Sequence, residues 1–133
     1  NYLKILIVED DFYSRKLLQR FLAPYGDCDI AVNGREAVDA YERSLKEEFG
    51  YDLVCLDLAL PVMDGQETLR KIREIEEQHG IYADDCVKVI ITSATKDKRN
   101  ILDAICTGAE GYVAKPISRD KLLSTVKELG VIE

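Results

Sequence analysis

Short apolar runs alternate along this chain with longer segments in which apolar residues recur every three or four positions. The runs lie at residues 3–8, 28–32, 52–57, 87–92 and 111–114, and turn-forming residues flank each of them. Continuous apolar runs of this length are typical of strands that are buried on both faces. The pattern therefore predicts five strands of a parallel sheet.

The segments between and after these runs predict amphipathic helices, because their apolar residues share one helical face. The residues concerned are Leu17, Leu18, Phe21 and Leu22, then Ala37, Val38, Tyr41 and Leu45, then Leu69, Ile72 and Ile75, then Ile101, Leu102 and Ile105, and finally Leu122, Leu123 and Val126. Asn33-Gly34 predicts the start of the second helix, and Ser118 predicts an N-cap for the last. Strand and helix thus alternate five times, which indicates an α/β fold with a doubly wound parallel sheet and helices on both faces.

Length and charge limit the domain count and the partners. We expect residues 1–133 to form one domain, because 133 residues suffice for one core. A net charge of −7 argues against binding nucleic acid by electrostatics alone. No secretory signal is apparent, and no apolar run approaches the roughly 20 residues that span a bilayer. We therefore expect a cytoplasmic domain with no membrane contact.

The four cysteines give no sign of a metal centre. Cys28, Cys55, Cys86 and Cys106 form no C-x-x-C pair, which argues against a zinc site. We interpret them as small buried residues with free thiols in a reducing compartment.

Polar residues that carry chemistry lie at the ends of four predicted strands. They are Glu9-Asp10 after the first strand, Asp57 at the end of the third, Thr92-Ser93 at the fourth and Lys115-Pro116 after the fifth. Ligands of open α/β sheets bind at the carboxyl ends of the strands. A carboxylate at the end of a buried strand is costly unless something outside the strand uses it. The positions predict one solvent-facing acidic pocket that also holds a hydroxyl and an ammonium group.

Such a pocket suits a divalent cation and phosphoryl chemistry. Glu9, Asp10 and Asp57 would repel one another, and a cation relieves that repulsion. Oxygen-only ligands favour Mg²⁺. The Asp57 carboxylate could then attack phosphorus and form an acyl phosphate. Lys115 would balance charge on one phosphoryl oxygen, and the Ser93 hydroxyl would donate to another.

Several stretches together resemble a known family over nearly the whole chain. They are residues 5–11 (ILIVEDD), 31–38 (AVNGREAV), 51–57 (YDLVCLD), 61–65 (PVMDG), 91–94 (ITSA) and 108–116 (GAEGYVAKP). This combination resembles a response-regulator receiver domain of two-component signalling, of the chemotaxis-regulator type. The resemblance implies a flavodoxin-like sheet with strand order 2-1-3-4-5. It also implies a phosphorelay signalling module that catalyses only its own phosphorylation and dephosphorylation, rather than a general enzyme.

The resemblance also implies roles for particular residues. Asp57 would accept a phosphoryl group from a phosphohistidine on a sensor histidine kinase or a histidine phosphotransferase. Glu9, Asp10, Asp57 and the backbone carbonyl of Ala59 would bind Mg²⁺. Ser93 would be the switch hydroxyl; Thr92 lies beside it, but the Ser93-Ala94 pair fits the hydroxyl-Ala pattern of the family.

Three further features follow from the resemblance. Tyr112 matches the aromatic residue that changes rotamer on activation, and the Lys115–Pro116 peptide is expected to be cis. Ala59 and Thr95 would flank the phosphoryl group, and neither offers more than a short hydroxyl to hold a water, which predicts slow hydrolysis. Residues 96–127 would form a face for a downstream protein or for self-association.

Three alternative functions use the same residues differently. A flavodoxin-like electron carrier would share the sheet order, but Glu9-Asp10-Asp11 would repel a flavin phosphate. A phosphatase that works through an aspartyl phosphate usually has a second Asp two residues after the first, where this chain has Ala59. An inactive docking module would not need the complete set of acids together with Ser93 and Lys115.

Overall fold

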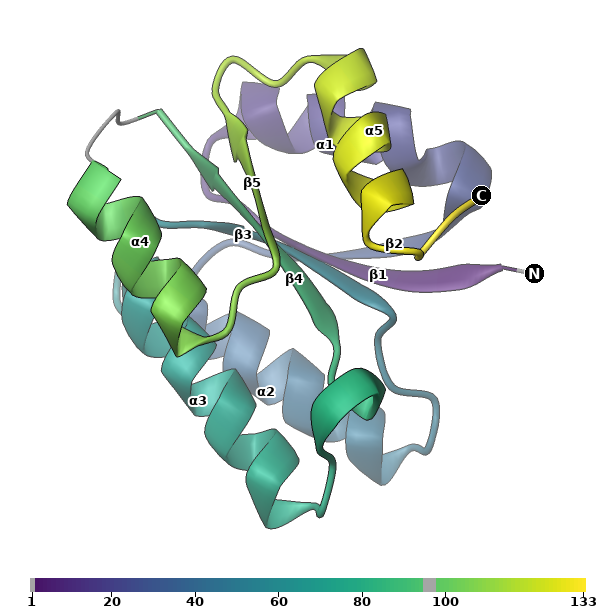
Figure 1. Cartoon of the computed structure of the whole chain (residues 1–133), viewed down its shortest axis with the longest axis vertical. Helices are drawn as coiled ribbons and strands as arrows, with labels where there is room; N and C mark the ends of the chain where they lie inside the picture. Colours follow the sequence, from purple (N-terminus) through teal and green to yellow (C-terminus); the bar gives the residue numbers. More distant parts are fainter. Residues whose placement is uncertain (1, 95–97) are drawn as a thin grey trace.

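Five parallel strands form a single twisted sheet with helices packed on both of its faces (Figure 1). This computed structural model describes residues 2–94 and 98–133. The strands are β1 (Leu3–Val8), β2 (Gly26–Ala31), β3 (Leu53–Asp57), β4 (Lys88–Ser93) and β5 (Gly111–Ala114). Their order is β2-β1-β3-β4-β5, and every neighbouring pair is parallel. The predicted doubly wound α/β fold and its strand order 2-1-3-4-5 are confirmed.

The largest difference from the predicted strands is at β2, which begins two residues earlier than expected. This strand lies at one edge of the sheet, and Asp27 and Asp29 on it are exposed. An edge strand need not be apolar throughout, because one side of it faces water. The search for continuous apolar runs therefore missed its polar beginning.

Helices follow the strands at short intervals in the described part of the chain. They are α1 (Phe12–Leu22), α2 (Gly34–Lys46), α3 (Gly65–Gln78), α4 (Lys98–Thr107) and α5 (Arg119–Glu128), with the 3₁₀ helices η1 (Ala23–Tyr25) and η2 (Ala83–Asp85). The side chains of Asp11, Asn33, Asp64 and Ser118 accept hydrogen bonds from backbone N–H groups and cap α1, α2, α3 and α5. Such caps replace hydrogen bonds that the first helical turn lacks. The start of α2 at Gly34 confirms the start predicted from Asn33-Gly34, and the Ser118 cap confirms the one predicted for the last helix.

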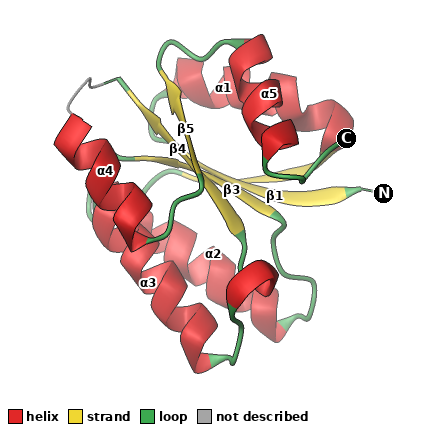
Figure 2. Ribbon diagram, viewed as in Figure 1, coloured by secondary structure: helices red, strands yellow, loops and turns green. Residues whose placement is uncertain are grey.

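Helices lie on both faces of the sheet (Figure 2), and an apolar cluster of side chains fills the space on each face. One lies between the sheet and α2, α3 and α4, and it takes Leu6 and Val8 from β1. The other lies against α1 and α5, and it takes Ile5 and Ile7. Successive residues of a strand point to opposite faces, so the central strands must be apolar at every position. Each Leu or Ile buried in this way stabilises the fold by about 2 kcal/mol.

The start of α3 packs directly against the end of β3. A Cβ atom on Gly65 would lie 2.5 Å from the carbonyl oxygen of Asp57 and 2.6 Å from the Cα of Leu58. The Gly65 N–H also donates a hydrogen bond to the carbonyl oxygen of Leu58 at 3.0 Å. Only glycine permits this approach. The loop that follows Asp57 is therefore held by the first turn of α3.

The cysteines are free, but not all of them are buried. Cys55 is buried in β3, Cys28 and Cys86 are half-buried, and Cys106 is exposed on α4. The expectation of buried thiols is therefore wrong for Cys106. In the described residues, none of the helices combines the length and the apolar character that a membrane crossing requires.

Candidate functional site

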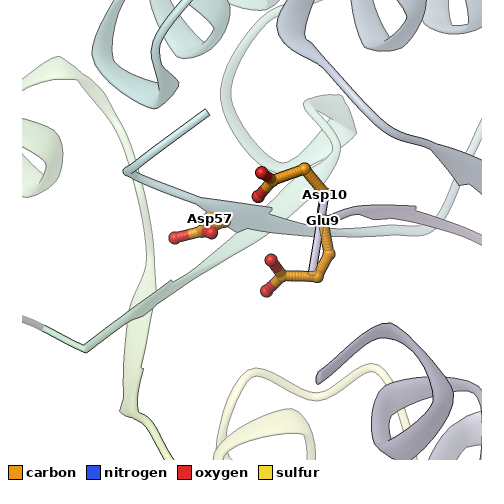
Figure 3. Close-up of side chains that lie close together, drawn as sticks. All are labelled: Glu9, Asp10 and Asp57. Carbon is orange, nitrogen blue, oxygen red and sulfur yellow. The ribbon is translucent and has the colours of Figure 1, made fainter. Parts of the chain in front are cut away.

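Three carboxyl groups meet at the carboxyl ends of β1 and β3 (Figure 3). Glu9 and Asp10 follow β1, and Asp57 ends the adjacent strand β3. One oxygen of each carboxyl group lies within 4.8 Å of the other two. The structure thus brings together the three acids singled out by the sequence. Asp10 is exposed as expected, but Glu9 is fully buried, so the expectation that it faces solvent is wrong.

The turn after β1 is held by the helix that follows it. The Asp11 N–H donates to Glu9 Oε2 at 3.1 Å, while the Asp11 side chain caps α1. Arg15 Nη1 donates to the carbonyl oxygen of Glu9 at 3.2 Å and to that of Asp10 at 3.4 Å. These contacts fix the backbone of both acidic residues against the first turn of α1.

Both oxygens of Asp57 have partners. The backbone N–H of Ala59 donates to Oδ1 at 3.1 Å, and the ammonium of Lys115 donates to Oδ2 at 3.0 Å. The side chain is only 4% exposed. A carboxylate held by two donors keeps one orientation, which suits a nucleophile that must attack along a defined line.

Lys115 joins two of the three acids. Its Nζ lies 2.7 Å from Glu9 Oε1 and 3.0 Å from Asp57 Oδ2. Glu9 Oε1 is fully buried, and the Lys115 ammonium is its ion-pair partner. The N–H of Lys115 donates to the carbonyl oxygen of Ser93 at 2.9 Å, which ties the start of this loop to β4. The Lys115–Pro116 peptide is cis, which confirms the expectation.

Burial and the neighbouring charges both shift the pKa values of Glu9 and Lys115. Burial raises the pKa of Glu9 to about 7, and the negative charge of Asp57 adds to this, whereas Lys115 opposes it. Burial alone would lower the pKa of Lys115, but its contacts with Glu9 and Asp57 outweigh that effect and raise it. One ammonium faces three carboxyl groups, so the cluster still has an excess of acid.

The cluster fits a hard divalent cation. Its side-chain donors are all carboxylate oxygens, which are the ligands that Mg²⁺ prefers. The buried Glu9 Oε1 has an ion pair with Lys115 Nζ as its charged contact among the described residues, and a cation would add a second partner of opposite charge. Asp10 is exposed, so an ion held there would keep bound waters, as Mg²⁺ usually does.

Asp57 also lines a cavity of about 450 Å³ at this edge of the sheet. The other lining residues are Leu58, Ala59, Ser93, Ala94, Asn100 and Lys115. Among the described residues, Ser93 and not Thr92 therefore brings a hydroxyl side chain to the lining of the cavity. Sequence analysis missed Asn100, because it lies inside a helical segment and no motif marks it.

Another predicted residue, Tyr112, does not line the described part of the cavity. Tyr112 is half-buried and packs against the apolar cluster on the α2, α3 and α4 face of the sheet. Thr95 lies outside the described residues. The structure therefore gives no support for direct contact between Tyr112 and a phosphoryl group. Its role as an aromatic switch next to α4 stays a prediction.

Comparison with known proteins identifies the family. Residues 5–127 match the model of the response regulator receiver domain, which is nearly the whole chain. The chain belongs to this family, and it is a receiver domain of two-component signalling.

Two relatives show how this domain is used alone and as a segment of a larger protein. The chain is 31% identical over 127 residues to the chemotaxis protein CheY of Bacillus subtilis (strain 168), and the match covers 94% of this chain and 95% of that protein. It is 34% identical over 124 residues to the hybrid signal transduction histidine kinase I of Dictyostelium discoideum. That match covers 92% of this chain but spans only 7% of the kinase.

Two solved structures have the same fold at similar identity. One is the CheX–CheY–BeF₃–Mg²⁺ complex from Borrelia burgdorferi, with a TM-score of 0.83, 30% identity and coverage of 98% of this chain and 90% of that one. The other is the complex of the Saccharomyces cerevisiae histidine phosphotransfer protein Ypd1 with the receiver domain of Ssk1. Its TM-score is 0.82 at 29% identity, with the same coverage of both chains.

Proposed function

We propose that Asp57 is the phosphoacceptor of this receiver domain. The observation that carries the proposal is the buried Asp57 carboxylate, which Lys115 and the Ala59 N–H hold at the wall of the 450 Å³ cavity. The donor is a phosphohistidine on a sensor histidine kinase or a histidine phosphotransferase. One oxygen of Asp57 forms a bond to phosphorus while the bond between phosphorus and the imidazole nitrogen breaks, and the imidazole leaves with the electron pair.

Lys115 and Ser93 stabilise the transferred group. The Lys115 ammonium lies 3.0 Å from Asp57 Oδ2, so it is in reach of a phosphoryl oxygen attached at that carboxylate. Ser93 lines the same cavity, and its hydroxyl donates to a second phosphoryl oxygen. Donors that are already oriented stabilise charge in the transition state without having to reorganise.

Glu9, Asp10, Asp57 and the backbone carbonyl of Ala59 hold Mg²⁺ in this proposal. The ion, when bound, neutralises the negative charge that would otherwise keep a phosphoryl group away from three acids. Lys115 alone cannot do this, because its charge is already shared between Glu9 and Asp57. The domain acts on its own Asp57 and on no external substrate, so the reaction resets when water or a partner removes the phosphoryl group.

The histidine donor docks beside the start of α1. It must bring an imidazole to the cavity of Asp57, and α1 begins two residues after Asp10. Phe12 and Tyr13 in its first turn are 63% and 67% exposed. They line a hollow of about 650 Å³ together with Lys16, Leu17, Gln19 and Arg20. An apolar patch with a basic border fits a donor surface that is apolar with an acidic border.

The output face includes α4, β5 and α5. Leu102 and Ile105 on α4 are 58% and 46% exposed, although they are apolar. Exposed basic residues accompany them on α4 and α5, namely Lys98, Arg99, Arg119 and Lys121. Residues 96 and 97 of the predicted 96–127 face lie outside the described residues. A downstream protein or a second copy of this chain binds here once Ser93 moves toward the phosphoryl group and Tyr112 follows.

The test is phosphorylation by a small-molecule phosphodonor such as acetyl phosphate with Mg²⁺. The chain should gain the mass of one phosphoryl group, and Asp57→Asn should abolish the gain. Asp52→Asn is the matched control, because Asp52 directly precedes β3 at the opposite end of that strand and is exposed. Labelling of Asp57→Asn at the rate of the native chain would show that another residue is the acceptor.

A further inference from the structure

One polar side chain of the Asp57 cavity has no role in the proposed function. The polar residues among those described in its lining are Asp57, Ser93, Lys115 and Asn100. The first three react or bind the phosphoryl group. Asn100 is a half-buried residue in the first turn of α4, and it lines the same cavity.

Gln66 fixes the orientation of this carboxamide. Gln66 Nε2 lies 2.6 Å from the backbone carbonyl oxygen of Asn100, which can only accept, so nitrogen and not oxygen must face it. The same Nε2 lies 2.8 Å from the side chain of Asn100, so the atom there must be the acceptor Oδ1. The donor Nδ2 of Asn100 is therefore turned away from Gln66.

The residue that orients Asn100 lies close to the backbone of Asp57. Gln66 is the second residue of α3, and its neighbour Gly65 packs against the backbone of Asp57 and Leu58. Asn100 is therefore positioned from the same short segment that positions the phosphoacceptor loop. A polar group held in this way can orient a reactant with little entropic cost.

Hydrolysis of the phosphoryl group needs a side chain that holds the attacking water, and the described lining residues with an assigned role do not supply one. A phosphoryl group on Asp57 has three terminal oxygens. The proposed function gives two of them to Lys115 and Ser93, and the cation, when bound, would offset the remaining charge. The attacking water must lie in line with the bond between Asp57 and phosphorus. Ala59 lines the cavity but has no polar side-chain atom to hold that water. Among the described lining residues, Asn100 supplies the remaining polar side chain.

We propose that Asn100 is a catalytic residue for hydrolysis of the aspartyl phosphate, with Gln66 as its positioning residue. Asn100 Nδ2 donates to one lone pair of the water, and the other lone pair attacks phosphorus. The new bond joins the water oxygen to phosphorus, and the bond between phosphorus and Asp57 breaks. Asp57 regains its carboxylate, and both protons of the water leave with dihydrogen phosphate. This inference rests on the proposed function of Asp57.

The test compares release of phosphate with uptake of phosphate in the same preparations. Each chain is labelled with acetyl phosphate and Mg²⁺, the donor is removed, and phosphate release is followed at constant Mg²⁺. Asn100→Leu should slow release about fivefold, the value of one hydrogen bond, and leave the labelling rate unchanged. Asp103→Leu on the exposed face of α4 is the control and should change neither rate.

Gln66 gives a second test that does not depend on the fold of the Asn100 variant. Gln66→Met removes the N–H donors that hold Asn100 and should slow phosphate release. Gln66→Lys keeps a nitrogen donor for both Asn100 oxygens and should release phosphate at close to the native rate. If the Asn100→Leu and Gln66→Met variants take up label but release phosphate at the native rate, this inference is wrong. It is also wrong if these variants lose labelling and release together. Both results would leave the proposed function of Asp57 standing. A native chain that takes no label would overturn the proposed function and this inference with it.

Discussion

Asp10→Asn should make the domain more stable without metal and less stable with it. The substitution keeps the shape of the side chain and removes one of three carboxylates whose oxygens lie within 4.8 Å of one another. At that separation, two unit charges in a water-like dielectric repel by about 1 kcal/mol. Asp10 is exposed, so this dielectric applies to its interactions with Glu9 and Asp57.

The net gain follows from adding the neighbouring charges. Asp10 loses two repulsions of about 1 kcal/mol each, and dissolved salt screens an exposed charge and reduces their sum by about half. Lys115 itself remains paired with Glu9 and Asp57. Without Mg²⁺ the variant should thus gain about 1 kcal/mol, which raises the midpoint of thermal unfolding by about 4 °C.

Mg²⁺ should reverse the ranking. A ligand that binds only the folded state stabilises it by about 1.4 kcal/mol for each tenfold excess of its concentration over Kd. The native chain should gain this stability, and Asp10→Asn should gain much less because one charged ligand is gone. The unfolding midpoints of the two proteins should therefore cross as Mg²⁺ is added.

The assay is thermal unfolding followed by circular dichroism at pH 8, first with a chelator and then across a Mg²⁺ series. Asp39→Asn is the control, because it removes the same formal charge from an exposed position on α2. It should leave both the metal-free midpoint and its rise with Mg²⁺ unchanged. If the unfolding midpoint of Asp10→Asn in chelator lies below that of the native chain, Asp10 has a structural role. If Mg²⁺ raises the midpoint of Asp10→Asn as much as that of the native chain, Asp10 is not a ligand of the ion.

Three further predictions concern docking, stability and the switch. Phe12→Ala and Tyr13→Ala should slow phosphoryl transfer from a phosphorylated histidine phosphotransferase but not labelling by acetyl phosphate; equal slowing of both would argue against a docking role. The buried Tyr41 hydroxyl donates to Glu76 Oε2 at 2.7 Å, so Tyr41→Phe should cost about 2 kcal/mol in denaturant unfolding at pH 8. Burial and the hydrogen bond to Glu76 raise the pKa of Tyr41, so its stabilising effect is complete below about pH 10 and declines at higher pH. Above pH 10 the free energy of unfolding of Tyr41→Phe should therefore fall less steeply than that of the native chain. Equal slopes of the two free energies against pH would refute this. A beryllofluoride phosphoryl mimic should shift the amide resonances of α4, β5 and Tyr112, and shifts limited to the Asp57 loop would contradict the switch.

The sequence by itself determined the elements and the reactive edge of the sheet. Runs such as residues 3–8 are apolar at every position because their strands are buried on both faces, and this is a local property that can be read without knowing the neighbours. The acids at the carboxyl ends of β1 and β3 could be found in the same way, because the carboxyl ends of parallel strands lie at one edge of the sheet. The matching motifs then identified the family without a structure.

Only the tertiary structure decided the environment of each reactive group. Glu9 and Asp10 are neighbours in sequence, yet Glu9 is buried with a raised pKa and Asp10 is exposed. Asn100 reaches the Asp57 cavity, and Gln66 orients it across 34 residues of sequence. Burial and side-chain orientation depend on how separate helices and strands pack. Periodicity along the chain reports which face of an element is apolar, but it does not report which side chains of different elements meet.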